Sequence, residues 1–385
     1  MTGGEIIYLD HAAATPLDRR ALAAMQPYFS DDFYNPSAAY APAIRVRHDY
    51  ESAKATIAHT IGASKDEIIM TAGATESINL AFFSVSGHVV VSAIEHHAVL
   101  AAATTHDNTI IPVDKKGIVN LETVQAAIRP DTGLVSVALA NNEIGTIQPI
   151  RDIAEIIKLE RRRRLAANEE MPIYFHCDAS QGIGQLDVNV ARLGVDMLTL
   201  NAGKFYGPKQ VAVLWAASHV HIAPMIVGGG QERGLRSGTE NVAGVIGCAV
   251  AIELALQHRL GEAKRLGILR DEMQKRLVTA FPDSVVSGNQ KHRLSGNLHI
   301  AFPNIDGERV LFSLESRGVL VATGSACAAN KGTRSHVLTA IGLEPHVADG
   351  SLRITLGRLS NEENINKATE IIIEEVKKEY ERMKT

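Results

Sequence analysis

Lys204 lies where an apolar segment of the sequence ends. Residues 197–200 predict a buried strand, and Lys204 follows it in a turn marked by Gly207 and Pro208. In open α/β sheets, ligands bind beyond the carboxyl ends of the strands. A desolvated lysine has a lowered amine pKa and can form a Schiff base with a carbonyl group. Lys204 is therefore the first candidate for chemistry.

Polar residues also follow four other apolar segments. After residues 67–70, the small residues at 71–77 form a turn that opens a predicted helix. The backbone N–H groups of this turn, together with the Thr75 hydroxyl, form a natural phosphate site. The segment at 88–94 is followed by the imidazole of His96, and the segment at 134–140 by the amide of Asn142. The segment at 172–177 is followed by the carboxylate of Asp178 and the amide of Gln181.

Together these groups match the requirements of pyridoxal phosphate, which needs a lysine, an acid beside the pyridine nitrogen and a phosphate site. We expect Asp178 to keep the ring nitrogen protonated and His96 to stack on the ring and take part in proton transfer. Gln181 and Asn142 could donate to the ring oxygen. A nicotinamide or nucleotide cofactor fits less well, because no strand is followed by G-x-G-x-x-G and no G-x-x-x-x-G-K-[ST] occurs.

The composition is typical of a soluble globular enzyme. The chain has 385 residues, 45% hydrophobic and 21% charged, and its formal net charge of −4 gives no basic field for nucleic acid. No apolar run approaches the roughly 18 residues that cross a bilayer, and the N-terminus lacks a secretion-signal pattern. Cys177, Cys248 and Cys327 show no paired metal-ligand spacing and favour a reducing compartment. We expect a cytoplasmic protein without a metal site or membrane association.

Seven short apolar segments alternate with amphipathic ones between about residues 66 and 260. Their nearly continuous apolar character is typical of strands buried on both faces of a mainly parallel sheet flanked by helices. Helices are predicted at 74–85 and 152–170, and strands at 67–70, 88–94, 108–113, 134–140, 172–177, 196–200 and 211–215.

After residue 259 the pattern becomes that of a smaller α+β region. A predicted helix at 262–281 precedes strands at 297–303, 319–323 and 351–357 and a charged C-terminal helix at 361–383. We therefore predict an α/β fold with two domains. The large domain would comprise residues 16–258, and the small domain residues 1–15 and 259–385.

Four consecutive arginines, at 161–164, lie near the end of a predicted helix. They could contact RNA or an acidic surface, but cations near a helix C-terminus are commonly solvated and interact favourably with the helix dipole. We interpret the run as a solvated helix end.

Nine ordered motifs resemble those of the cysteine desulfurases of the NifS/IscS type. These are pyridoxal-phosphate-dependent enzymes of aminotransferase class V with the fold-type I architecture, and the similarity extends from about residue 6 to 375. The resemblance implies this fold and activity for nearly the whole chain. The motifs are YLDHAAATP, TAGATESINLA, EHHAVL, NNEIGTIQPI, HCDASQGIGQ, KFYGPK, GGGQERGLRSGTEN, GSACAANKGTRSHVL and SLRITLGR.

The resemblance implies a role for each candidate residue. Lys204 would bind pyridoxal 5'-phosphate covalently, with Asp178 at the pyridine nitrogen, Gln181 at the ring oxygen and His96 stacked on the ring. Around the substrate, Asn142 would lie beside the ring, and Arg353 would bind the carboxylate, a bidentate task that suits a guanidinium. The phosphate would contact Ala74, Thr75, Asn201, Gly203 and Thr239.

Thr239 would reach the phosphate from a second subunit, which implies a homodimer with shared active sites. Cys327 would be the nucleophile, and it lies in the small polar segment ATGSACAANKGTRSH, whereas Cys177 and Cys248 lie in apolar patterns. Its thiolate would attack the sulfur of bound L-cysteine, leaving a persulfide on Cys327 and releasing L-alanine. A protein acceptor in iron–sulfur cluster assembly or tRNA thiolation would then take the sulfur.

Residues 201–204 depart from the family pattern of serine, small residue, histidine and lysine. Here Asn201, Ala202 and Gly203 precede Lys204. The loss of a side-chain donor to the phosphate costs on the order of 1.5–3 kcal/mol, so we expect weaker cofactor retention.

Two alternatives to the desulfurase remain open. The first is selenocysteine lyase or another class V reaction on a small amino acid, which need not depend on Cys327 in the same way. The second is a cofactor-poor binding or regulatory protein, suggested by Asn201 and Gly203. The joint presence of the candidate catalytic and binding side chains argues against it.

Overall fold

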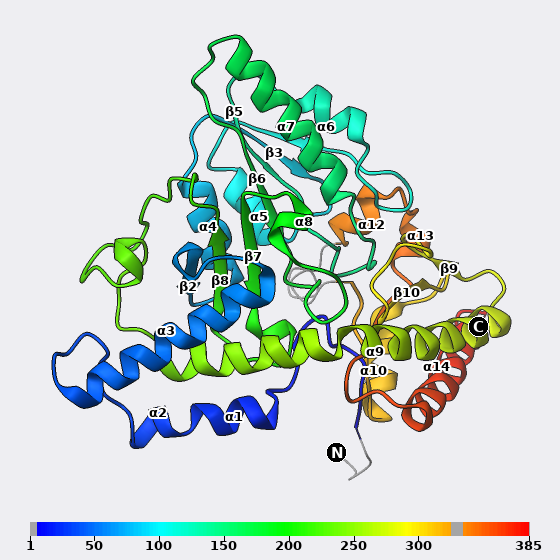
Figure 1. Cartoon of the computed structure of the whole chain (residues 1–385). Helices are drawn as coiled ribbons and strands as arrows, with labels where there is room; N and C mark the ends of the chain where they lie inside the picture. The colour runs from blue at the N-terminus through cyan, green and yellow to red at the C-terminus, as the bar shows by residue number, and fades with distance from the viewer. Residues whose placement is uncertain (1–5, 325–333, 385) are drawn as a thin grey trace.

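The computed structural model describes residues 6–324 and 334–384 (Figure 1). Its centre is a seven-stranded sheet in the order β2-β8-β7-β6-β5-β3-β4. The five strands from β7 to β4 are parallel, whereas β8 runs antiparallel to both of its neighbours. The strands are β2 (Ile68–Thr71), β3 (His88–Ser92), β4 (Asn108–Ile111), β5 (Thr132–Ser136), β6 (Tyr174–Asp178), β7 (Met197–Asn201) and β8 (Ala212–Ala216).

Helices cover both faces of this sheet, which confirms the predicted α/β fold class. Val90 of β3 belongs to one apolar core, whereas its neighbours Val89 and Val91 belong to another, as the alternation of side chains along a strand requires. The second core includes α4 (Ala74–Phe83) and α5 (His97–Ala103). The first core includes α1 (Arg19–Met25), α3 (Ala41–Ile61), α6 (Leu121–Ala127), α7 (Ile150–Ala166), α8 (Val190–Leu193) and α9 (Val242–Ala280).

A further apolar core surrounds two small sheets. Ile7 and Leu9 pack there with side chains from the region between Leu266 and Val376, so the segment around β1 joins the C-terminal region in one core. One sheet has the order β12-β10-β9 and is antiparallel, and the other pairs β1 with β11 in parallel. The elements are β1 (Ile7–Tyr8), β9 (Val285–Val286), β10 (Asn297–Ala301), β11 (Val319–Leu320), β12 (Ser351–Thr355), α10 (Gly307–Ser316) and α14 (Glu362–Arg382). Two further helices, α12 (His336–Ala340) and α13 (Pro345–Ala348), pack in a separate small core with Ile94 and Ile144. The domain boundaries at 15/16 and 258/259 stay a prediction.

Helix α9 links the two parts of the molecule (Figure 1). Cys248 and Ile252 lie in the core of the large sheet, whereas Met273 and Leu277 lie in the core of the small sheets. The predicted helix at 262–281 is thus the second half of a longer one. Within the described residues, α9 is the one helix whose length and composition would suit a membrane span, but more than half of its apolar window is buried, as in a core helix.

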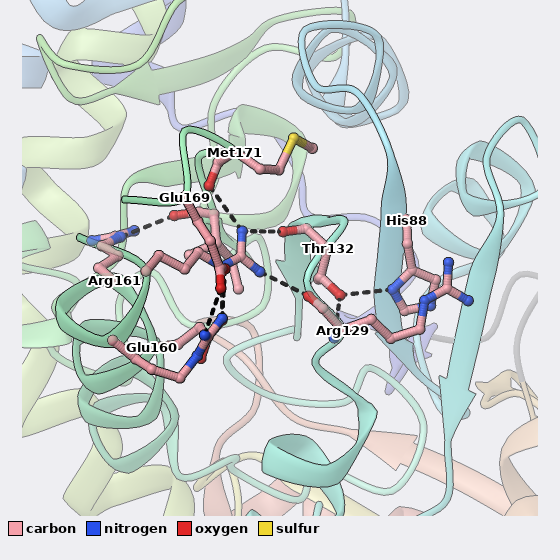
Figure 2. A network of polar contacts seen from close by, with 10 residues as sticks. His88, Arg129, Thr132, Glu160, Arg161, Glu169 and Met171 are labelled. Carbon is pink, nitrogen blue, oxygen red and sulfur yellow. Dashed lines mark hydrogen bonds and ion pairs between the residues drawn. The ribbon is translucent and has the colours of Figure 1, made fainter. Parts of the chain in front are cut away.

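Of the four arginines, Arg164 is buried, Arg161 is half-buried and the other two are exposed. Figure 2 shows the polar contacts beside this run. The guanidinium of Arg164 donates to the carbonyl oxygens of Thr132 (2.9 Å), Met171 (3.0 Å) and Arg129 (2.9 Å), and its Nε donates to Glu160 (2.7 Å). Arg129 lies between α6 and β5, Thr132 begins β5, and Met171 lies between α7 and β6, so Arg164 joins three separate parts of the chain beside α7. The interpretation as a solvated helix end is therefore wrong for Arg164.

Candidate active site

A cavity of about 210 Å³ lies where parallel strands β6 and β7 end. Strand β6 ends at Asp178, β7 ends at Asn201, and α4 begins at Ala74. The fold thus gathers at one sheet edge residues that are far apart in sequence. Nine predicted site residues line the cavity: Ala74, Thr75, His96, Asn142, Asp178, Gln181, Asn201, Lys204 and Arg353.

Lys204 reaches the cavity through a 3-10 turn, Ala202–Lys204, that follows β7. Its Nζ donates to the carbonyl oxygens of Ala12 (2.8 Å) and Ala13 (2.6 Å), which belong to the segment after β1. The Asn201 side chain caps the turn by accepting the backbone N–H of Gly203 at 3.1 Å. The N-terminal motif and the β7 turn together therefore position the amine.

His96 is the N-cap of α5, and its Nδ1 accepts the backbone N–H of Ala98 at 3.1 Å. In the neutral imidazole the proton must therefore be on Nε2. Desolvation lowers the pKa of His96, and the positive charge of Lys204 adds to this, while Asp178 opposes it. His96 is thus a neutral ring at pH 7, open to the cavity.

Asp178 has its carboxylate held by the chain that follows β6. Its Oδ1 accepts the N–H of Ser180 at 2.9 Å. Two residues earlier, His176 bonds to the hydroxyl groups of Ser136 (2.8 Å) and Thr199 (2.9 Å). Burial lowers the pKa of His176 to about 4, so its imidazole is neutral at pH 7 and forms no ion pair with Asp178. The carboxylate is therefore available to a cationic ring nitrogen.

Arg353 lies on β12 and is 1% exposed. Its Nη2 is 2.7 Å from Asp10 Oδ1, and its Nη1 donates to the Asn142 carbonyl oxygen at 3.5 Å. Its Nε has no hydrogen-bond partner among the described residues. The structure thus places a guanidinium next to Asn142 on the cavity wall, where it can bind a carboxylate.

Three predicted residues do not line this cavity. Gly203 adjoins Lys204, but it stands outside the set of lining residues and gives its N–H to Asn201. Thr239 is exposed and lines a different cavity of about 200 Å³, so it does not reach the Lys204 site of its own chain. Cys327 lies outside the described residues.

Ser180 is a site residue that the sequence analysis did not single out. Its hydroxyl is buried, has no hydrogen-bond partner among the described residues, and belongs to the cavity lining. The sequence feature that could have identified Ser180 is its position two residues after Asp178, the last residue of β6. Its unused hydrogen-bonding capacity suits a polar ligand.

These features fit pyridoxal phosphate. The N-cap of helix α4 is Gly73, which supplies no side-chain cap, so the first N–H groups of the helix remain for an anion. An added Cβ at Gly73 would meet nothing within 4 Å, so there is space at this helix end. Because Asn201 Oδ1 is engaged, the side chain offers its Nδ2 hydrogens as donors. With Lys204 and Asp178, the cavity holds an amine, a carboxylate and a phosphate site.

Comparison with known proteins gives a consistent result. The family model of aminotransferase class V matches residues 7–367. The cysteine desulfurase IscS of Dictyoglomus turgidum is 41% identical over 378 residues, covering 95% of this chain and 93% of the relative. A solved NifS-like protein superposes with a TM-score of 0.87 at 33% identity, covering 96% of this chain and 98% of that one.

A second solved structure, titled SspA in complex with cysteine, has a TM-score of 0.75 at 34% identity and covers 91% of this chain and 98% of that one. The family model spans most of the chain, including all of the residues that line the cavity. The chain belongs to the aminotransferase class-V family.

Proposed function

We propose that the protein is a pyridoxal-phosphate-dependent cysteine desulfurase that converts L-cysteine to L-alanine and keeps the sulfur as a persulfide on Cys327. The observation that carries this proposal is the single cavity shared by Lys204, Asp178, His96, Arg353 and the uncapped start of α4. The names of relatives such as the Dictyoglomus turgidum protein support the same activity.

Each cavity residue has a task that its geometry suits. Lys204 would hold the cofactor covalently, and the Asp178 carboxylate would keep the pyridine nitrogen protonated. His96 would stack on the ring and move a proton at Nε2, since Nδ1 is engaged. When bound, the cofactor supplies an electron sink for the substrate. The phosphate would be held by Ala74, Thr75, Ser180 and Asn201.

Substrate recognition would rest on Arg353 and Asn142. The Arg353 guanidinium, fixed by Asp10, would bind the carboxylate of L-cysteine, and Asn142 lies beside it. The Cys327 thiolate would then attack the substrate sulfur. A sulfur–sulfur bond forms as the carbon–sulfur bond breaks, so the sulfur stays on Cys327 and alanine leaves after protonation.

We further propose a cytoplasmic homodimer with shared active sites. The exposed position of Thr239, away from the Lys204 cavity of its own chain, supports a contact with the phosphate of a partner subunit. The persulfide would pass to a protein acceptor in iron–sulfur cluster assembly or tRNA thiolation.

The test is to incubate the purified protein with L-cysteine and to quantify alanine and protein persulfide together. Both should form, and Cys327→Ser should abolish the persulfide while Lys204 still binds the cofactor. Alanine without a Cys327-dependent persulfide would favour another class V reaction. A parallel assay with selenocysteine would identify a selenocysteine lyase if Cys327→Ser kept its activity. Absence of a cofactor adduct on Lys204 would contradict every version of the proposal.

A further inference from the structure

Glu232 forms a buried polar cluster outside the cofactor cavity. Its carboxylate accepts hydrogen bonds from the Tyr50 hydroxyl (2.5 Å), from Lys54 Nζ (2.8 and 3.0 Å) and from the backbone N–H of Met70 (2.9 Å). Glu232, Lys54 and Tyr50 are 8%, 3% and 4% exposed, so this ion pair is almost wholly removed from water. All of its partners lie outside the segment that carries Glu232.

The backbone at this point is in an unfavourable conformation. Glu232 and Arg233 have φ angles of 48° and 59°, in the left-handed region that residues with a Cβ rarely adopt. Such positions persist when surrounding contacts fix them, and they concentrate at functional sites. The bonds to Tyr50, Lys54 and Met70 are contacts of that kind.

The segment 226–240 is closed on itself around this turn. The N–H of Ser237 donates to the Ile226 carbonyl oxygen at 3.0 Å, and the N–H of Gly238 donates to Gln231 Oε1 at 2.9 Å. Thr239 follows directly and is exposed. The hydrogen bonds that hold Glu232 in place therefore also restrict the position of Thr239.

A second anchor holds the same segment to the start of α4. Arg236 Nε donates to Glu76 Oε1 at 2.8 Å, and Glu76 Oε2 accepts the N–H of Ala72 at 2.9 Å. Met70, bonded to Glu232, lies on β2 just before this junction. The Thr239 segment is thus held at two places, by Glu232 at β2 and by Arg236 at the first turn of α4.

We propose that Glu232 is a positioning residue for the cofactor site of the partner subunit, because it fixes the segment that presents Thr239. This inference rests on the proposed homodimer with shared sites. A buried ion pair contributes little net stability, but the loss of one partner is strongly unfavourable, so such a pair specifies one arrangement. Here the pair fixes the turn at Glu232 and Arg233, which lies in the segment that carries the exposed Thr239.

The test uses heterodimers purified without cofactor, in which one protomer carries Lys204→Ala and only the other can form an adduct. Glu232→Gln is placed either on the Lys204→Ala protomer or on the protomer that keeps Lys204. The adduct on Lys204 is reduced with borohydride and quantified by mass spectrometry against pyridoxal phosphate concentration. This readout needs no turnover.

Glu232→Gln on the Lys204→Ala protomer should raise the apparent Kd of its partner roughly tenfold, the effect of a lost hydrogen bond to a charged group. On the protomer that keeps Lys204, it should change the Kd less than about twofold. Equal effects in both placements, or a larger effect in the second, would overturn the inference.

Two further variants separate this inference from the proposed function. Thr239→Val on the Lys204→Ala protomer should reproduce the tenfold effect; if it does not, the shared active site is wrong, and the inference fails with it. If Thr239→Val acts and Glu232→Gln does not, the inference alone is wrong. Should Glu232→Gln fail to fold, Tyr50→Phe removes one hydrogen bond to Glu232 and should raise the partner's Kd about threefold. An unchanged Kd in this variant would overturn the inference.

Asp196 offers a matched control. It is a buried carboxylate that pairs with Arg161 and His219 and accepts the N–H of Phe175, but it precedes β7, at the opposite end from the cavity. Asp196→Asn should lower stability in a comparable way and leave the Kd of both sites within about twofold. A tenfold effect of Asp196→Asn would show that general destabilisation explains the result.

Discussion

Arg353 and Asp10 form an ion pair in which Nη2 lies 2.7 Å from Oδ1. The pair joins β12 to the segment that follows β1, the same segment whose Ala12 and Ala13 carbonyl groups accept the Lys204 amine. The N-terminal motif therefore orients both the predicted cofactor lysine and the predicted carboxylate-binding arginine.

Arg353→Lys should raise the KM for L-cysteine about 10- to 100-fold with a smaller change in kcat. Lysine has one donor centre, so it cannot pair with Asp10 and also bind a carboxylate through two parallel hydrogen bonds. Loss of binding that is shared by ground state and transition state appears mainly in KM. Steady-state kinetics of alanine formation measures both constants.

Arg358→Lys is the control for this change. Arg358 also pairs with an aspartate, Asp18, at 2.8 Å. It lines a separate, smaller cavity of about 60 Å³ that also borders Lys204, and it is not among the residues that line the cavity of about 210 Å³. The KM of the Arg358→Lys variant for L-cysteine should stay within about twofold of the KM of the unsubstituted protein. A KM unaffected by Arg353→Lys would show that the substrate carboxylate binds elsewhere.

The sheet and much of the site could be predicted because a strand buried on both faces leaves a plain pattern, and its carboxyl end marks where ligands bind. Other features depend on tertiary contacts that no local pattern encodes. Arg164 is buried because three carbonyl groups from separate segments need its donors. Asp10 contacts Arg353, and Ser180 lines the cavity, only because the fold brings the N-terminal segment and the end of β6 to the same place. The length of α9 was missed because its apolar first half resembles the other core segments.

Gly203→His should tighten cofactor binding by roughly 10- to 100-fold if the imidazole donates to the phosphate, since a hydrogen bond to a charged group contributes about 1.5–3 kcal/mol. A Cβ at Gly203 would lie 3.4 Å from Asn201 Oδ1 and 3.7 Å from Lys209 Cγ, so the site has room for a side chain. Titration of the cofactor-free protein with pyridoxal phosphate measures the effect. Gly203→Ala, which adds no donor, should leave the Kd unchanged, and equal affinities of all three proteins would refute this account.

Glu95 should make the stability of the protein depend on pH. Its Oε1 accepts hydrogen bonds from Ser92 Oγ (2.6 Å) and the N–H of Ala138 (3.0 Å), and its side chain is buried behind the cavity. Burial raises the pKa of Glu95 from an ordinary 4.5 to about 8. Between these values the folded state holds a proton that the unfolded state releases, so the free energy of unfolding falls as pH rises, by up to ~5 kcal/mol.

Glu95→Gln should remove this dependence, because the amide stays uncharged. Urea unfolding at pH 5.5 and 8.5 gives the comparison, and the substituted protein should gain stability relative to the original at pH 8.5. If both proteins respond equally to pH, Glu95 does not titrate in this window.

Arg164→Ala should lower the free energy of unfolding by about 3–5 kcal/mol, because it leaves the carbonyl groups of Thr132, Met171 and Arg129 without their donor. Arg162 belongs to the same run but is exposed, so Arg162→Ala should change stability by less than about 0.5 kcal/mol. Urea unfolding of both variants measures the contrast between neighbouring arginines of one helix. Equal effects would mean that the hydrogen bonds of Arg164 contribute no more than a solvated charge, and the run would again be a simple helix end.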